Sequence, residues 1–304
     1  MEPQDIRSFG GTDCEMTQRT PGILLPRMRH AAPPAWSGRI AKGPARWYPF
    51  SMPPAHRLAS FFVGVDIGNS RAKFGVFHRG RLSRVVSFSV SRLPATLPLP
   101  TAGGHVAGVF VASVVPEREH AILHLVEDSF RVSARLIRPE DCDVPLGVTN
   151  RKTVGVDRVL AAKAAYRRCA GALIVVSIGT AITVDRVSEK GVFEGGAIIP
   201  GPELWLSSLA ETSLLPKVSF SCRARLPGKN TSAAIAGGAR FGLAAAIDRL
   251  ISEMEHTGRP RIFLTGGWAR TFKTMLAHRA AVCPHLVLEG LHLLFRQTNG
   301  KTTP

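Results

Sequence analysis

Short apolar runs alternate with amphipathic stretches from residue 61 onward, and this pattern predicts an α/β fold. Two pairs of apolar runs are each separated by a short turn rich in glycine and polar residues, which is typical of a strand, turn and second strand. These pairs occupy residues 61–67 with 72–77, and residues 173–177 with 181–187. Further strands are predicted over 108–115, ending before Pro116, and over 261–264.

Helices are predicted between these strands, over residues 118–130, 154–168, 204–211 and 231–253. The second of them ends in two arginines, whose charge suits the C-terminal end of a helix dipole. Asn230 or Thr231 is the predicted N-cap of the last helix. The stretch between the strand at 181–187 and the helix at 204–211 is predicted to be a loop, with the sequence GVFEGGAIIPGPE.

The first 58 residues differ in composition from the rest of the chain. They are rich in Pro, Arg, Gly and Ser and show neither helical nor strand periodicity, so we expect a disordered, basic extension. Two interpretations remain open: a basic targeting arm, or a start codon assigned too early, with Met52 as the true start of translation. The remaining chain is predicted to form one lobe over 59–150, a second lobe over 151–296 and a tail over 297–304.

A net charge of +17 favours anionic partners, but the basic residues are scattered and form no long cluster, so nucleic acid is not an expected partner. The five cysteines are far apart and form no CxxC pair. This distribution favours a reducing cytoplasm over a disulfide framework or a zinc site. No uninterrupted apolar stretch approaches the length of a membrane span, so no membrane association is expected.

Two turns repeat one pattern, DIGNS at 66–70 and SIGTA at 177–181. Gly68 and Gly179 lack a Cβ, which permits a tight turn and the close approach of backbone N–H groups to a phosphate. The polar residues after them can add hydrogen bonds to phosphate oxygens; they are Asn69, Ser70, Thr180 and Thr183. Either turn alone is also what an ordinary hairpin would show. Their duplication favours two related lobes that hold one nucleotide between them.

The motifs DIGNS, GVDR, GTAITVD, GGAIIPG, TSLLP, GKNT, TGG and LEGL occur in the order found in type III pantothenate kinases, so the chain resembles that family from about Phe62 to Leu294. The resemblance implies two ribonuclease-H-like lobes of the actin, Hsp70 and sugar kinase superfamily, with a nucleotide cleft between the lobes. It also implies a homodimer, with pantothenate near the subunit interface. The implied reaction is the ATP-dependent phosphorylation of pantothenate to 4'-phosphopantothenate, the first step of coenzyme A biosynthesis.

The same resemblance assigns roles to individual residues. Asp157 would accept the proton of the attacking hydroxyl, and Asp66 would help to hold Mg²⁺, chiefly without direct contact. The implied substrate-binding residues are Gly155, Val156, Asp157, Arg158 and Thr231. The implied ATP-binding residues are Asp66, Gly68, Asn69, Ser70, Lys73, Gly179 and Thr180. Gly266 and Gly267 would face adenosine or form a simple turn, whereas Lys229, Thr212 and Glu289 are assigned first to surface, structure or interface.

One departure from the family pattern concerns a monovalent cation. The family usually has Asp before x-Gly-Thr-Ala, where it holds K⁺ or NH₄⁺, and this chain has Ser177. A neutral hydroxyl is a poorer cation ligand than a carboxylate, so weak or absent dependence on K⁺ or NH₄⁺ is expected. Asp185 lies too far along the predicted strand to be an assured replacement. A smaller departure is Ala161, where Asn is common after GxDR.

Two other functions remain open: a kinase of the same superfamily that acts on a sugar or an acid, and a non-catalytic regulatory relative. The presence of both Asp66 and Asp157 argues against lost catalysis.

Overall fold

The computed structural model describes residues 59–98, 104–211, 214–221, 224–255 and 259–300. The expectations for residues 1–58 and for Thr212 lie outside this part of the chain. Within these ranges, no helix is both long enough and apolar enough to cross a bilayer.

The first sheet has five strands in the order β3-β2-β1-β4-β5. The three strands β1 (Ala59–Ile67), β2 (Arg71–His78) and β3 (Arg81–Ser89) form an antiparallel meander. The other two, β4 (Gly104–Ser113) and β5 (Ala134–Ile137), run parallel to β1. Strand β1 therefore lies at the centre, and its C-terminal end leads directly into the first glycine turn.

The second sheet repeats this arrangement. Its strands are β6 (Leu173–Ile178), β7 (Ala181–Val187), β8 (Phe193–Pro200), β9 (Arg261–Thr265) and β10 (Ala280–Val282), in the order β10-β9-β6-β7-β8. Strands β6, β7 and β8 are antiparallel, and β9 and β10 run parallel to β6. Both sheets thus have the same connectivity, so the predicted α/β fold of two ribonuclease-H-like lobes is confirmed.

The prediction of a loop over 191–203 was wrong, because most of this stretch forms β8, which pairs with β7. Glycines at 195 and 196 obscure the strand signal in the sequence. A Cβ at position 196 would collide with the carbonyl oxygen of Val184 on the neighbouring strand. The pairing of β8 with β7 therefore requires glycine at position 196, and the residue does not indicate a loop.

The four predicted helices occur with shifted ends, as α1 (Pro116–Phe130), α2 (Val156–Arg168), α3 (Pro202–Ala210) and α4 (Thr231–Met254). Asn230 is the N-cap of α4, with its side chain accepting a hydrogen bond from the Ala233 N–H at 2.8 Å. Two further helices, α5 (Ala269–Lys273) and α6 (Leu286–Gly300), were not predicted. Two short 3₁₀ turns cover Pro139–Cys142 and Arg151–Thr153.

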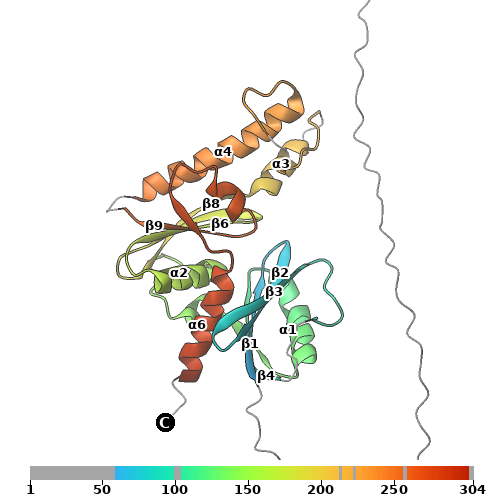
Figure 1. Ribbon diagram of the computed structural model, residues 1–304, viewed down its shortest axis with the longest axis vertical. Coiled ribbons are helices and arrows are strands. Elements are labelled where there is room, and N and C mark those ends of the chain that lie inside the picture. The colour runs from blue at the N-terminus through green and yellow to red at the C-terminus, as the bar shows by residue number, and fades with distance from the viewer. Residues whose placement is uncertain (1–58, 99–103, 212–213, 222–223, 256–258, 301–304) are drawn as a thin grey trace, which may run out of the picture. The chain divides into compact units, whose positions relative to one another are not determined.

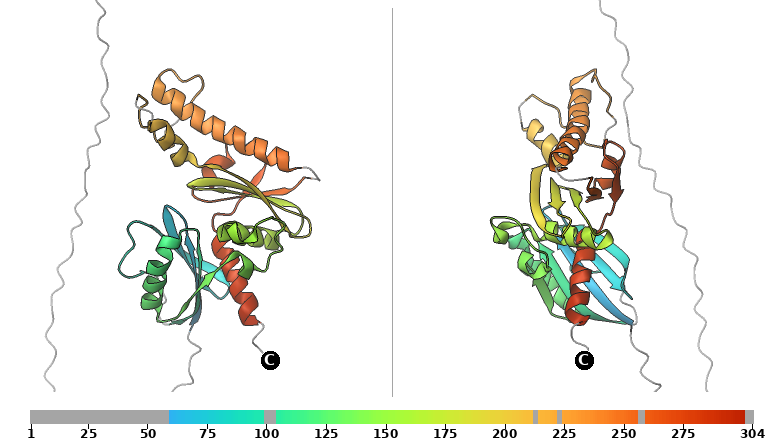
Figure 2. Two further views of the ribbon diagram at one scale, coloured as in Figure 1. Left: turned by 180° about the vertical axis from the view of Figure 1, so that it is seen from behind. Right: turned by 90° about the vertical axis from the view of Figure 1, so that its left-hand side faces the viewer.

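Helices α2 and α6 lie side by side between the two sheets (Figures 1 and 2). The apolar face of α6 packs against β1 and β4, where Leu291 and Leu294 join Phe62 and Phe110 in one buried cluster. Alanines of α2 pack with Phe193 on the second sheet. Helix α1 covers the other face of the first sheet, while α3, α4 and α5 cover the outer face of the second. The division into lobes at residue 150 stays a prediction, since α6 follows the second sheet in sequence but packs on the first.

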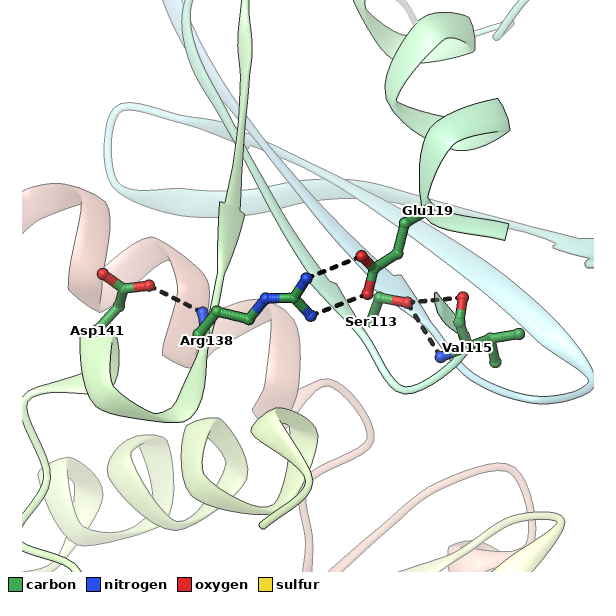
Figure 3. A network of polar contacts seen from close by, with 5 residues as sticks. All are labelled: Ser113, Val115, Glu119, Arg138 and Asp141. Atoms are coloured by element: carbon green, nitrogen blue, oxygen red, sulfur yellow. Dashed lines mark hydrogen bonds and ion pairs between the residues drawn. The ribbon is translucent and has the colours of Figure 1, made fainter. Parts of the chain in front are cut away.

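The junction between β4 and α1 is fixed by the polar network in Figure 3. The Ser113 hydroxyl both donates to the carbonyl of Val115 and accepts from its N–H, which shapes the turn before α1. The Arg138 guanidinium donates two 3.0 Å hydrogen bonds to the carboxylate of Glu119 on α1. Asp141 in turn accepts a hydrogen bond from the backbone N–H of Arg138 at 2.9 Å. These bonds attach α1 to the chain that follows β5.

Replacing Gly290 with Ala should destabilise the protein. A Cβ at this position of α6 would collide with the Leu160 carbonyl of α2, and such overpacking costs about 1–3 kcal/mol. The matched control is Gly238→Ala on α4, where an added Cβ meets no atom within 4 Å. There the better helix propensity of Ala should stabilise the protein by up to about 1 kcal/mol. Urea unfolding of both variants tests the prediction, and equal midpoints would refute it.

Candidate functional site

A cavity of about 460 Å³ is lined by residues from both lobes. Its walls comprise the two glycine turns, the start of α2, the end of β9 and the residues that lead into α6. The predicted residues that line it are Asp66, Gly68, Asn69, Ser70, Lys73, Asp157, Ser177, Gly179, Thr180, Thr183, Gly266 and Gly267. The structure therefore brings all of the predicted phosphate-binding residues together in one interlobe cleft.

The two glycine turns differ in length, with four residues between paired strands in the first and three in the second, and they meet in the cleft. The Gly68 N–H donates to the Arg71 carbonyl, and the Gly179 N–H donates to the Ala181 carbonyl, each at 3.0 Å. The hydroxyls of Ser70 and Thr180 are 2.8 Å apart and share a hydrogen bond across the cleft. A phosphate chain placed at this point would be within reach of donors from both lobes.

Asp66 lies at the end of β1, opposite Lys73 on β2. The Lys73 Nζ is 3.4 Å from Asp66 Oδ2. Burial raises the pKa of Asp66 from its ordinary value, and the nearby Lys73 ammonium only partly offsets this effect. Lys73 therefore brings a positive charge to the floor of the cleft beside a buried carboxyl group.

Asp157 occupies the first turn of α2 and also faces the cleft. Burial, and next to it the negative charge of Asp66, raise the pKa of Asp157 from 3.8 to about 6. A Cβ on Gly155 would lie 2.6 Å from Asp157 Oδ1, so the glycine leaves room for this carboxylate. A carboxylate with a pKa near 6 is a suitable proton acceptor at neutral pH.

Arg158 turns away from the cleft and pairs with Asp185 on β7. Its Nε donates to Asp185 Oδ1 at 2.9 Å, and its Nη2 donates to the same oxygen. Thr183 donates to Asp185 Oδ2, also at 2.9 Å. Asp185 is only 1% exposed and is absent from the cleft wall. The predicted role of Arg158 in substrate binding stays a prediction.

The other predicted substrate residues are not part of the cleft wall. Val156 is buried in the core beside α6, and Thr231 is exposed at the start of α4.

Ala161 is also buried in the core, so its methyl group replaces the usual Asn at a packing position rather than in the cleft. Glu289 accepts three hydrogen bonds from the Arg168 guanidinium and so joins α6 to the end of α2. Lys229 is exposed.

Ser177 lies in a row of neutral hydroxyls that crosses the second sheet. In the register of the sheet, Ser177 on β6 lies beside Thr183 on β7 and beside Thr265 on β9. All three residues line the cleft. Asp185 is held by Arg158, two residues beyond Thr183 along β7. It therefore does not supply the carboxylate that is missing at position 177.

The residues at the first turn suit Mg²⁺, although the described residues contain no group of three or more metal-ligating His, Cys, Asp or Glu side chains. Mg²⁺ in kinases needs only one or two carboxylates, because water and substrate phosphates complete its coordination. Asp66 and Asp157 share the cleft, and the charge of one raises the pKa of the other. A bound cation would relieve this repulsion.

Several residues in or beside the cleft were missed by the sequence analysis. Gly201 does not line the cleft but packs behind the second glycine turn: a Cβ there would collide with the carbonyl oxygen of Gly179, and the Gly201 N–H donates to the Thr180 carbonyl at 2.8 Å. Its place in the GGAIIPG motif was the available signal. His285 lines the cleft, and its buried Nδ1 has no hydrogen-bond partner among the described residues. Burial and then the charge of Lys73 lower the pKa of His285, and nothing in the sequence singled it out. Trp268 and Glu203 also contribute to the wall.

Comparison with known proteins identifies the family. The model of the type III pantothenate kinase family matches residues 62–253. A type III pantothenate kinase from Anaeromyxobacter sp. (strain K) is 32% identical over 249 residues, which cover 76% of this chain and 97% of that protein. Another, from Alkalilimnicola ehrlichii, is 37% identical over 245 residues and covers 77% and 97% of the two chains.

Among solved structures, a Campylobacter jejuni protein described as a Baf family transcriptional activator has the same fold, with a TM-score of 0.51 and 18% identity. The match covers 78% of this chain and 99% of that one. With the family model spanning most of both lobes, the chain belongs to the type III pantothenate kinase family.

Proposed function

We propose that this protein transfers the γ-phosphoryl group of ATP to the primary hydroxyl of pantothenate, giving 4'-phosphopantothenate for coenzyme A biosynthesis. The observation that carries the proposal is the single cleft in which Asp157 faces both glycine turns. Family membership supplies the identity of the acceptor.

In the proposed mechanism, ATP lies with its phosphates between the Gly68 and Gly179 turns. The backbone N–H groups, the Ser70 and Thr180 hydroxyls and the Lys73 ammonium stabilise the charge on the phosphate oxygens. Mg²⁺ held near Asp66 would supply further neutralisation. Asp157 orients the pantothenate hydroxyl for in-line attack and accepts its proton.

We further propose that the protein is a homodimer through the outer side of the second lobe. Among the described residues, five large apolar side chains are exposed, and all of them belong to β8, α3, α4 or the loop between α3 and α4. They are Ile198, Leu204, Leu214, Leu226 and Phe241. Exposed apolar groups of this size favour burial against a partner. Thr231, at the start of α4 and outside the cleft, would then contact pantothenate at the subunit interface.

We propose a cytoplasmic location as well. Cys142, Cys169 and Cys283 are free thiols in the described part of the chain, which suits a reducing compartment.

Purified enzyme should release ADP with pantothenate, and not with a panel of hexoses, hexitols and short-chain acids. The reason is that the two glycine turns and Asp157 of the GVDR motif line one cleft in a chain that belongs to this family. A coupled pyruvate kinase and lactate dehydrogenase assay measures the release. Turnover of a sugar with indifference to pantothenate would instead identify a different kinase, and no turnover with any acceptor would favour a regulatory protein.

Asp157→Asn should lower kcat by at least about 100-fold, because proton transfer and alignment of the alcohol are both lost. Binding of ATP, measured by calorimetry, should stay near the wild-type value. In the unmodified enzyme kcat/KM should fall below about pH 6, as Asp157 becomes protonated. Asp128→Asn, which alters an exposed carboxylate on α1, is the matched control and should leave the profile unchanged.

The same variant offers a readout that is independent of catalysis. Because the folded-state pKa of Asp157 exceeds its unfolded value of 3.8, ionisation destabilises the fold as pH rises through about 6. Asp157→Asn should therefore be more stable than wild type at pH 8, by about 1–3 kcal/mol, and the difference should shrink at pH 4. A decrease in thermal stability at pH 8 would contradict this environment for the carboxylate.

Turnover should be similar in Na⁺, K⁺ and choline buffers of equal ionic strength. The row of Ser177, Thr183 and Thr265 offers only neutral oxygens, which bind a monovalent cation weakly. Steady-state kinetics in the three buffers check the expectation. Strong activation by K⁺ or NH₄⁺ would defeat it.

Phe241→Glu should shift the protein from dimer to monomer in light-scattering chromatography and raise KM for pantothenate. The substitution places a charge on the exposed apolar side of α4. Ala95→Glu, at an exposed position in the first lobe, is the control and should remain dimeric. A wild-type protein that is monomeric at micromolar concentration would exclude this interface.

A further inference from the structure

A second cavity, of about 490 Å³, lies beside α2 and α6 and shares no lining residue with the interlobe cleft. Its floor is apolar, formed by side chains that include Val144, Ala162, Val187 and Leu293. Four cationic residues from three separate elements converge on it. Lys163 and Arg167 come from α2, Lys190 from the turn between β7 and β8, and Arg296 from α6. We call this cavity the basic pocket.

The charges of the basic pocket are poorly balanced within the described structure. Asp143 is its only acidic lining residue, and its carboxylate lies 3.9 Å from Lys163 Nζ. Lys163 is further fixed by a 2.8 Å hydrogen bond to the Cys142 carbonyl. No ion pair within the described ranges involves Arg167, Lys190 or Arg296. These three cations are therefore available to an anion from outside.

Tyr166 contributes an aromatic wall to the same pocket. Its hydroxyl donates to the Glu189 carbonyl at 2.9 Å, which fixes the ring against the turn between β7 and β8. Gly191 in that turn has φ +77, and a Cβ there would lie 2.9 Å from the ring. The turn that presents Lys190 is thus held against α2, so the cationic rim is built on packed elements.

We propose that the basic pocket is a second ligand site, which binds a small organic phosphate with an apolar group. Arginine guanidinium groups bind phosphate oxygens through paired, charge-assisted hydrogen bonds. The apolar floor and Tyr166 suit the nonpolar part of such a ligand. The cavity volume lies in the range of small-molecule sites, which favours a metabolite over a macromolecular surface.

The site is positioned to affect the cleft through the two helices that reach both cavities. Helix α2 carries Asp157 at one end and Arg167 about 15 Å along its axis. Helix α6 contributes Leu288 to the cleft and Arg296 to the basic pocket. Binding at the basic pocket does not depend on which acceptor the cleft uses.

Ligand-observed NMR with phenyl phosphate as the probe tests this proposal. The full chain is saturated beforehand with a nonhydrolysable ATP analogue, Mg²⁺ and pantothenate, so that the cleft is blocked. Wild type should bind the probe, whereas benzyl alcohol, which lacks the negative charge, should bind far more weakly. Lys190→Glu combined with Arg296→Glu should weaken probe binding by at least about tenfold, since two cations are replaced by two anions.

The matched control is Arg81→Glu combined with Arg84→Glu, two exposed positions on β3 that change the net charge by the same amount. This control should bind the probe within about twofold of wild type. Retained pantothenate turnover and the thermal midpoint report on folding of both double variants. Absence of binding by wild type, equal binding by both double variants, or equal losses in both would overturn the proposal.

Discussion

The burial of α2 between two sheets is the constraint on which the site depends. Small side chains make up much of the buried surface of this helix: Ala161, Ala162, Ala164 and Ala165 are all almost fully buried, together with Val159 and Leu160. Gly290 has no side chain, and this lets α6 lie directly against the Leu160 carbonyl group of α2. Because α2 packs against strands of both sheets and against α6, the carboxylate in its first turn has a defined place in the cleft that both glycine turns line.

The distribution of charge follows from the same packing. Three carboxyl groups lie near one another, with Asp66 and Asp185 buried and Asp157 partly buried, and the loss of solvation raises the pKa of each. Arg158 pairs with Asp185 and Lys73 pairs with Asp66. Within the described ranges Asp157 forms no ion pair, and it accepts a 2.9 Å hydrogen bond from the backbone N–H of Arg158. A carboxyl group that has lost solvation and has no ion-pair partner has a higher pKa than an exposed one, so it is a stronger base.

The parts of the site that depend on local patterns could be predicted from the sequence. Each glycine turn follows a buried strand, and the repetition of the pattern was enough to indicate two related lobes. The loop predicted at 191–203 and the unpredicted α6 show where local patterns no longer suffice. The glycines of β8 are required by a neighbouring strand, and α6 is stabilised by contacts with residues far away in sequence. The turn of Arg158 away from the cleft likewise depends on Asp185, a partner 27 positions later.

Helix α6 has a consequence for biosynthesis. Its leucines complete the apolar cluster of the first sheet around Phe62 and Phe110, yet they are translated only after every strand of the second sheet. The part of the N-terminal sheet that α6 covers must remain without this helix while the second sheet is being translated. Nascent chains that stall before residue 286 would therefore present an aromatic, aggregation-prone surface, of the kind that chaperones recognise.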